Sequence, residues 1–421
     1  MANDNKKYIP ELRFPEFQND GEWKTCKLLD IAKRKVTKNR QGLKLPVYTN
    51  SAIGGVVNQE EYFDREIVTK DNLVNYSIIE HNDFVYNPRV STAAPVGPIS
   101  RNKLDKGIMS PLYLIFGFHK GDINFYEYYF KSTHWHNYLK AKANYGARFD
   151  RINIATDDFM DMPMPYPSLR EQKKIADCLS SLDKEIDATK RKLEQLKEHK
   201  KGLMQKLFPA KGKTLPKLRF PEFKNEGEWE VYALGQIFSR ITEKNTLNNQ
   251  NVLTISAQYG LISQYDYFNK NVAALDVSKY YLVNKGDFAY NKSKSQGYPY
   301  GAIKALKLYN QGVVSPIYIC FRIKDNQNFS KVFFEYYFES ELIHKEINSI
   351  SQEGARNHGL LNISTEDFFA KINLYVPSLT EQFKIANTLS SIDKQIAKYD
   401  EKIKALELHK QGLMQQLFPK L

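Results

Sequence analysis

Two stretches of the sequence decide the fold, because the second repeats the first. Pro167 to Pro209 reads PSLREQKKIADCLSSLDKEIDATKRKLEQLKEHKKGLMQKLFP, and Pro377 to Pro419 reads PSLTEQFKIANTLSSIDKQIAKYDEKIKALELHKQGLMQQLFP. The copies align without a gap, and apolar residues recur at alternating intervals of four and three. This is the a/d pattern of a long helix that needs a helical partner, and the obvious partner of each helix is the other. The predicted seam consists of Ile175, Leu179, Leu182, Ile186, Leu193 and Leu196 in the first helix and Ile385, Leu389, Ile392, Ile396, Ile403 and Leu406 in the second.

The ends of both helices can be read from the sequence. Glu171 and Glu381 follow the opening Pro-Ser-Leu and place negative charge in the first turn, where a helix has unpaired backbone donors. Pro209 and Pro419 end the helices, because proline cannot continue the hydrogen-bond ladder. At a rise of about 1.5 Å per residue the apolar pattern predicts a rod of roughly 50 Å.

A lysine interrupts each seam at the same heptad position, at Lys200 and Lys410. A polar seam residue can fix the register or orientation of two helices at some cost in stability. The long side chain can equally reach past the seam into solvent. The sequence favours neither role over the other.

A short segment ahead of each globular region is also duplicated. PELRFPEFQNDGEW runs from Pro10 to Trp23, and PKLRFPEFKNEGEW starts at Pro216. Prolines and a glycine in so few residues predict an extended strap rather than a helix. The second strap follows the first helix directly, whereas no helix precedes the first strap. We therefore expect the first strap to pack against the end of the second helix, in a circular arrangement with a pseudo-twofold relation.

Between strap and helix lies a globular region, roughly residues 24–165 in one half and 230–375 in the other. Short β-branched and aromatic runs between Gly, Pro and Asn predict strands. The aromatic run at 126–130, repeated at 334–338, predicts a helix whose rings form core rather than a base-stacking platform. Other segments diverge, such as PRVSTAAPVGPIS against KSKSQGYPYGAIK. We expect two α+β domains with a shared scaffold and divergent loops, where specificity usually lies.

Length and charge indicate several domains and a polyanionic partner. The chain has 421 residues, with 61 Lys and Arg against 48 Asp and Glu, a formal net charge of +13. No apolar run approaches the length of a membrane span, and the start MANDNKKYIP contains no signal-peptide core. Cys26, Cys178 and Cys320 form no paired spacing, so we interpret them as reduced thiols of a cytoplasmic protein.

The doubled pattern of strap, variable region, PSLxEQxxIAxxLSSxDKxI and GLMQxLFP resembles the specificity subunit of Type I restriction-modification enzymes over essentially the full length. The resemblance implies two target-recognition domains, each reading one half of a bipartite sequence in double-stranded DNA. It implies two helical regions that set the gap and bind two methyltransferase subunits, with restriction subunits joining in the full complex. It also implies no catalytic centre or cofactor on this chain, so that S-adenosylmethionine, ATP and Mg²⁺ belong to the partner subunits.

The repeat geometry agrees with this resemblance. Antiparallel packing of two equal rods places the globular halves at opposite ends, and equivalent faces of duplex DNA recur about every 34 Å. A rod of roughly 50 Å therefore allows two separate major-groove contacts. Because the two loop sets differ, the half-sites should differ, and the target should be asymmetric.

Residues suited to DNA contact gather on the divergent loops. Phosphate contacts use Arg, Lys and small polar groups, and base reading uses Arg, Lys, Asn, Gln, Ser and Thr. Gly-Ala-Arg recurs before the last strand in both halves, and the resemblance implies that this loop approaches DNA, so Arg148 and Arg356 lead the set. The first half supplies Arg34, Lys35, Asn50, Ser51, Asn87, Arg89, Ser91, Thr92 and Arg148. The second half supplies Gln258, Tyr259, Asn291, Lys292, Ser293, Lys294, Ser295, Gln296, Arg356 and Asn357.

Several runs imitate catalytic signatures but are incomplete. The N-P-R-V run from Asn87 lacks the second proline and the aromatic residue of an amino-methyltransferase motif. The H-W-H run at 134–136 has no Cys or carboxylate cluster beside it in sequence and no counterpart in the other half, so we predict no metal site. The E-H-K run at 198–200 imitates a nuclease motif, but Leu408 replaces its glutamate in the other copy. No G-x-x-x-x-G-K-[ST] motif is present, which argues against ATP hydrolysis.

The sequence therefore predicts a non-catalytic DNA-reading subunit of a Type I restriction-modification complex. The alternative is a coiled-coil adaptor or a nucleic-acid-binding protein without sequence preference. The predicted organisation is target-recognition domain 1 at 1–165 with its strap at 8–23, helical spacer 1 at 166–210, target-recognition domain 2 at 211–375 with its strap at 214–229, and helical spacer 2 at 376–421.

Overall fold

The computed structural model describes residues 8–62, 70–143, 150–210, 212–256, 260–268, 276–295, 298–351 and 361–419. Its contacts divide the chain into two units: residues 1–190 with 401–421 form unit 1, and residues 191–400 form unit 2. This division runs through both long helices, so the domain boundaries predicted at residues 165, 210 and 375 stay predictions. Among the residues that the structure describes, no helix combines the length and apolarity needed to cross a membrane.

Among the described residues of unit 1, the strands form two four-stranded sheets, with the orders β2-β9-β6-β7 and β4-β3-β8-β5, and a separate pair β1-β10. The strands pair antiparallel except β3 and β8, which run parallel. The elements are η1 (Pro15–Phe17), β1 (Lys24–Lys27), α1 (Leu28–Ile31), β2 (Ala32–Lys35), β3 (Val47–Ser51), β4 (Gly55–Asn58), α2 (Gln59–Tyr62), η2 (Lys70–Asn75), β5 (Ser77–Ile79), β6 (Phe84–Tyr86), β7 (Ile99–Arg101), β8 (Gly107–Met109), β9 (Leu114–Phe118), α3 (Ile123–Lys131), α4 (His136–Lys142), α5 (Thr156–Met160) and β10 (Pro163–Tyr166).

Unit 2 repeats this plan. Its sheet β12-β19-β16-β17 and its pair β11-β20 match those of unit 1, whereas the second sheet is reduced to the pairs β13-β14 and β15-β18. A parallel bridge from Val252 to Val313 joins the segments that correspond to β3 and β8. The elements are η3 (Pro221–Phe223), β11 (Glu230–Ala233), α7 (Leu234–Ile237), β12 (Phe238–Arg240), β13 (Leu253–Ser256), β14 (Gly260–Ser263), α8 (Gln264–Phe268), β15 (Tyr281–Asn284), β16 (Phe288–Asn291), β17 (Ala302–Ala305), β18 (Gln311–Val314), β19 (Ile319–Ile323), α9 (Lys331–Tyr337), α10 (Glu341–Ile350), α11 (Thr365–Lys371) and β20 (Asn373–Val376).

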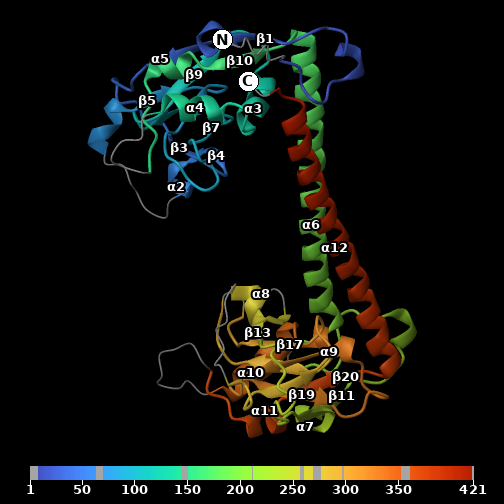
Figure 1. Cartoon of the computed structure of the whole chain (residues 1–421). Helices are drawn as coiled ribbons and strands as arrows, with labels where there is room; N and C mark the ends of the chain where they lie inside the picture. Colours follow the sequence, from blue (N-terminus) through green and yellow to red (C-terminus); the bar gives the residue numbers. More distant parts are fainter. Residues whose placement is uncertain are drawn as a thin grey trace. The chain divides into compact units, whose positions relative to one another are not determined.

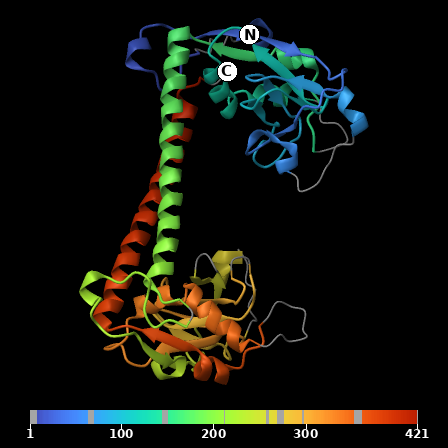
Figure 2. The ribbon, with the colours of Figure 1, turned by 180° about the vertical axis from the view of Figure 1, so that it is seen from behind.

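The two predicted helices are α6 (Leu169–Leu207) and α12 (Leu379–Gln416), which lie side by side in Figures 1 and 2. Two contacts in each unit show that they run antiparallel. In unit 1, Glu185 of α6 meets Lys402 of α12 at 2.9 Å, and the earlier Ile175 shares a core with the later Leu417. In unit 2, Lys200 meets Asp393 at 2.7 Å, and the later Leu207 shares a core with the earlier Ile385. Buried seam residues are Ile175, Leu179, Ile186, Leu193, Ile385, Leu389, Ile392 and Ile403, whereas Leu182, Leu196, Ile396 and Leu406 are partly buried.

The first residues of each seam do more than bind the partner helix. Ile175 and Leu179 belong to the aromatic core of unit 1, together with Leu417 and Phe418 from the end of the chain. Ile385 and Leu389 belong to the core of unit 2, with Leu207 and Phe208. Tyr126, Tyr129 and other rings of α3 are fully buried in the first core, as the aromatic spacing predicted. Each core is thus closed by the last turn of the helix from the other repeat.

The straps close the circular arrangement that the sequence predicted. The amide of Leu12 donates to the carbonyl of Gln416 at the end of α12 (3.0 Å), and the amide of Leu218 donates to that of Lys206 at the end of α6 (2.8 Å). The straps are extended apart from the single turns η1 and η3, which begin at Pro15 and Pro221. The first strap therefore packs on the second helix, although the two lie at opposite ends of the sequence.

An ion pair between strap and helix is repeated in both units. Arg13 Nε lies 2.7 Å from Glu171 Oε1, and Arg219 Nη2 lies 2.8 Å from Glu381 Oε2. The exposed fraction of these side chains is 9% or less. The glutamates that were predicted to serve the helix N-termini are therefore buried partners of the strap arginines.

We expect Glu381→Ala to destabilise unit 2, because it leaves the guanidinium of Arg219 buried without its carboxylate. Breaking a buried pair in this way typically costs about 3–5 kcal/mol. Peptide-resolved hydrogen exchange should show lost protection in β11 and β20. Glu222→Ala is the matched control, because Glu222 also forms an ion pair, with Lys384 at 2.8 Å, but at an exposed position. Equal protection in the two variants would contradict the assigned role.

Candidate nucleic-acid interface

One loop has the same frame in both units and different residues at its tip. In unit 1, Ser91 and Ala94 exchange backbone hydrogen bonds of 3.0 and 3.1 Å. In unit 2, Ser295 and Tyr298 do the same at 3.2 and 2.9 Å. We call residues 87–98 and 291–302 the tip loops. The exposed side chains include Arg89, Ser91 and Thr92 in the first tip loop and Lys294 and Ser295 in the second.

The frame of each tip loop is fixed by a glycine and a tyrosine. Gly97 and Gly301 have φ of 79° and 76°, and a Cβ at either would collide with the carbonyl oxygen of Asn87 or Asn291. Tyr86 Oη donates to the carbonyl of Val96 (3.0 Å), and Tyr290 Oη donates to the carbonyl of Tyr300 (2.8 Å). These hydrogen bonds anchor the two loops. A rigid base with variable exposed residues is the arrangement expected of a recognition loop.

Residues that follow the predicted Gly-Ala-Arg segments contact these loops. The residues after the first segment are held by the first tip loop, since the amide of Ile152 donates to the carbonyl of Pro88 (2.9 Å). In unit 2 the amide of Leu361 donates to the carbonyl of Lys292 (3.0 Å). The predicted residues Arg148, Gln258, Tyr259, Gln296, Arg356 and Asn357 themselves lie outside the described residues.

Three predicted contacts lie in the interior instead, and we leave them out of the interface. Asn50 is 2% exposed, and its Nδ2 donates to the carbonyls of Val85 (2.9 Å) and Pro98 (3.1 Å). Asn87 Nδ2 donates to the carbonyl of Asn50 (2.9 Å). Ser51 is buried, and its Oγ accepts from the amides of the β3–β4 turn. These amide and hydroxyl groups bond to backbone groups of the scaffold, so the structure places them in its interior and not on the exposed tips.

Asn291, Lys292 and Ser293, at the start of the second tip loop, are partly buried. Asn291 Oδ1 accepts from the amide of Ser293 (3.0 Å), a turn that matches Asn87 Oδ1 and the amide of Arg89 (3.1 Å). These residues shape the base of the loop and still expose part of their polar surface.

Arg34 and Lys35 are exposed at the end of β2. Lys35 Nζ lies 3.2 Å from Asp83 Oδ1, whose side chain is 6% exposed. Burial raises the pKa of Asp83 in spite of hydrogen bonds from the Glu80 amide and from Lys35. In unit 2, Asp287 is buried in the same way, with its pKa raised by burial, and Arg322 lies 2.9 Å away. Lys35 is thus partly committed to Asp83.

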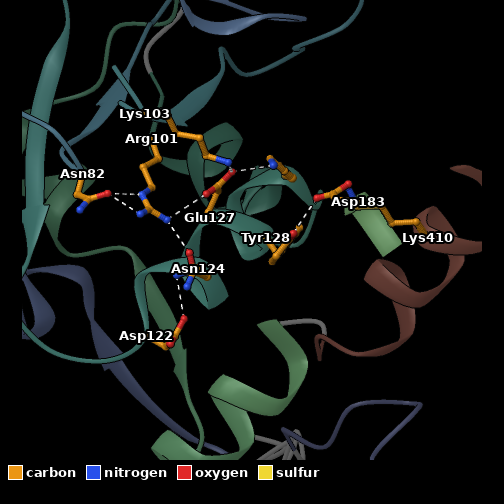
Figure 3. Close-up of polar contacts among 10 residues, drawn as sticks. Asn82, Arg101, Lys103, Asp122, Asn124, Glu127, Tyr128, Asp183 and Lys410 are labelled. Carbon is orange, nitrogen blue, oxygen red and sulfur yellow. Dashed lines mark hydrogen bonds and ion pairs between the residues drawn. The ribbon is translucent and has the colours of Figure 1, made fainter. Parts of the chain in front are cut away.

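Sequence reasoning missed a cluster of cations around Glu127 of α3 (Figure 3). Arg101, Lys103 and Lys131 approach this buried carboxylate at 3.3, 2.7 and 2.8 Å. Burial opposes its ionisation, but Lys131 and Lys103 prevail and hold the pKa of Glu127 below its ordinary value. The two lysine side chains are 63% and 41% exposed, so three cations against one carboxylate leave positive charge at the surface. The repeat could have indicated this cluster, because a lysine and a glutamate recur at the equivalent positions of unit 2. There Lys307 pairs with Glu335, as Lys103 pairs with Glu127 in unit 1.

A second polar network in each unit resolves the role of the seam lysines. Lys410 pairs with Asp183 Oδ1, and Tyr128 Oη donates to Asp183 Oδ2 at 2.7 Å (Figure 3). Burial opposes ionisation of Asp183, but the hydrogen bonds from Lys410 and Tyr128 hold its pKa below the ordinary value. We call Tyr128, Asp183 and Lys410 the first triad.

The second triad consists of Tyr336, Asp393 and Lys200 in unit 2. Lys200 Nζ lies 2.7 Å from Asp393 Oδ1, and Tyr336 Oη donates to Asp393 Oδ2 at 2.7 Å. Each lysine also lies over the tyrosine ring, at 5.0 Å for Lys200 and 5.4 Å for Lys410. The seam lysines are therefore paired across the helices and do not simply reach into solvent.

Within the described ranges no group of three or more His, Cys, Asp or Glu side chains could hold a metal ion. Of the H-W-H run, Trp135 is buried and His136 begins α4. Burial and the charges of Lys140 and His134 lower the pKa of His136 to about 4, so this imidazole is neutral near pH 7.

The family described as Type I restriction modification DNA specificity domain matches residues 20–198 and again residues 226–408. The chain belongs to this family. It carries two of the family's domains in tandem, and the matched parts coincide with the duplicated halves of the sequence.

Individual relatives agree. The chain is 37% identical over 83 residues to the type I restriction enzyme MjaVIII specificity subunit of Methanocaldococcus jannaschii, a match that covers 19% of each protein. It is 33% identical over 87 residues to the StySPI specificity subunit of Salmonella potsdam, which covers 21% of this chain and 18% of that protein. These matches span about a fifth of the length of either relative.

Two solved structures share the fold over nearly the whole chain. One, from work on complex assembly and conformational transition of the type I R-M system, has a TM-score of 0.53 at 16% identity and covers 95% of this chain and 98% of its own. The other, a Type I restriction-modification S subunit from M. genitalium, has a TM-score of 0.51 at 14% identity and covers 98% of this chain and 100% of its own. The predicted α+β fold with two tandem domains and paired long helices is confirmed.

We expect Asn50→Ala to destabilise unit 1 without changing the exposed surface. The variant loses two buried hydrogen bonds at about 1 kcal/mol each. A lower thermal transition and reduced hydrogen-exchange protection in β3 and β6 should show the loss of stability. Thr92→Ala, which changes only an exposed tip residue, should leave this protection unchanged. Wild-type protection in Asn50→Ala would restore Asn50 to the list of candidate DNA contacts.

Proposed function

We propose that this chain is the non-catalytic DNA-reading subunit of a Type I restriction-modification complex. Each specificity domain reads one half of an asymmetric bipartite target in duplex DNA. The helices α6 and α12 set the gap between the half-sites and dock two methyltransferase subunits, with restriction subunits joining in the full complex. Reaction chemistry, with S-adenosylmethionine, ATP and Mg²⁺, belongs to those partners, and we place the complex in the cytoplasm.

One observation carries the proposal: the tip loops have the same frame and different exposed residues. A shared frame fits two domains that approach DNA in the same way, and different tips fit two different half-sites. Arg89, Ser91 and Thr92 offer one guanidinium and two hydroxyls to the first half-site. Lys294 and Ser295 offer an ammonium and a hydroxyl to the second. The net charge of +13 supports the non-specific attraction to phosphate that precedes reading.

Fold likeness and family support the partner part of the proposal. The related structure that concerns complex assembly of the type I R-M system shares this fold over 98% of its length. The repetition of each strap, core and helix contact gives the chain two equivalent surfaces, which suits two copies of one partner.

Methylome sequencing of cells with and without this gene tests the proposed function. We expect a gapped, asymmetric methylated motif that is present only with the gene. A chain that acts as an adaptor or binds nucleic acid without sequence preference would leave the methylome unchanged. The purified complex should also prefer its target over random duplex and single-stranded RNA in competition.

We expect Lys294→Ala combined with Ser295→Ala to relax one half-site and leave the other intact. Loss of a base contact costs about 1–3 kcal/mol of discrimination, and loss of a phosphate contact lowers the slope of log affinity against log salt by about 0.9. The motif read by methylome sequencing, with titrations of the complex at several salt concentrations, separates the two effects. Lys224→Ala removes a charge that is also exposed, on the second strap, and it should change neither. Relaxation of both half-sites, or of neither, would contradict the loop assignment.

A further inference from the structure

The two triads tie three helices together at one point in each unit. In unit 1 the tyrosine comes from α3, the aspartate from α6 and the lysine from α12 (Figure 3). In unit 2 the tyrosine comes from α9, the aspartate from α12 and the lysine from α6. The aspartate always stands on the helix that follows its own domain, and the lysine on the helix of the other repeat. The same junction is therefore built twice from exchanged helices.

Stability alone does not account for these groups. Each lysine occupies a seam position between apolar side chains, and its own side chain is only 16% or 17% exposed. Charges taken from water recover little net free energy when they pair, and well-packed apolar replacements are often neutral or stabilising. Methionine at Lys200 would also match the neighbouring Met204 and Leu203 in polarity. A pair that adds little stability but is kept in both copies needs another role.

The triads add a preferred geometry to the contact between the helices and the domain. Leucine and isoleucine contacts tolerate small slides and rotations, whereas a carboxylate held by a tyrosine hydroxyl on one oxygen and an ammonium on the other has one preferred geometry. Polar seam residues fix register and orientation in coiled coils for this reason. Here the third member, Tyr128 or Tyr336, extends that constraint from the helix pair to the domain.

We propose that Tyr128, Asp183 and Lys410, with Tyr336, Asp393 and Lys200, are positioning residues that fix the angle at which each specificity domain sits on the helix pair. Since the proposed function makes this angle part of the spacing between half-sites, the triads hold the recognised gap to one length. This second statement rests on the proposed function, and the first does not.

A distance measurement within unit 2 tests the first statement. Spin labels at Leu308→Cys in the domain and Lys394→Cys on α12 occupy exposed positions. The background replaces Cys26 and Cys178 by serine and keeps Cys320, which is buried. We expect one narrow distance in the complete chain and a clearly broader distribution in Lys200→Met. Lys200→Arg, which keeps the charge, should restore the narrow distance.

The other repeat supplies the matched control. Lys410→Met makes the same change in the first triad, so it should leave the distance in unit 2 narrow. The thermal transition of Lys200→Met should fall only slightly, because Asp393 loses its cation but its side chain is 40% exposed and stays in contact with water. A narrow distance in Lys200→Met overturns the proposal. Broadening that comes with general loss of hydrogen-exchange protection also overturns it, since the lysine would then be a folding residue only.

Methylome sequencing of cells that carry the complete complex tests the second statement. In the wild type we expect a single gap length. In Lys200→Met and in Tyr336→Phe, methylation at gaps one base pair longer or shorter should rise about tenfold relative to the native gap, which corresponds to about 1.4 kcal/mol. A single gap in variants whose distance is broad overturns the link to spacing. Absence of any gene-dependent methylation in the wild type refutes the proposed function, and the distance measurement then decides the positioning role alone.

Discussion

The rest of the structure depends on the closure of each domain core by the helix end of the other repeat. Phe418, from the last turn of the second repeat, contacts Phe125 and Tyr129 at ring distances of 5.2 and 5.7 Å. Phe208 contacts Phe333 and Tyr337 at 5.7 Å each. Burial of such rings is among the largest favourable contributions that a side chain makes. Because these rings follow the last residues of α6 and α12, each domain core is complete only when the two helices are paired.

Polar contacts then give this apolar closure a defined geometry. The buried Arg13–Glu171 and Arg219–Glu381 pairs hold the straps against the helix starts, and the triads hold the helix pair against α3 and α9. In the tip loops, glycines at positive φ and tyrosine hydroxyls fix the backbone, and the side chains at the tips are exposed. The fixed contacts are thus concentrated in the shared scaffold, and the sequence differences are concentrated in the side chains at the tips of the loops.

The sequence predicted the scaffold well because its signals are periodic and repeated. The two helices, the straps, the closure on the far helix and the aromatic core all follow from spacing between apolar residues and from the offset of the copies. The site was harder, since loop composition does not tell interior polar groups from exposed ones. Asn50 and Asn87 have the residue type of a base contact, but they satisfy backbone carbonyls. Lys131 stands one turn from Glu127 on α3, but the cluster was missed because Arg101 and Lys103 reach this carboxylate only through the fold. For Lys200 and Lys410, heptad position identified the residues but not Asp183 and Asp393, which decide their role.

The exchange of helix ends also has a consequence for synthesis. Unit 2 is one continuous stretch, residues 191–400, whereas unit 1 takes residues 401–421 from the far end of the sequence. A ribosome that makes the chain from its N-terminus therefore delivers all of unit 2 before Leu417 and Phe418 exist to fill the core of unit 1. The domain that is translated first is the one whose interior is completed last, and its partly open aromatic surface must wait in the nascent chain until then.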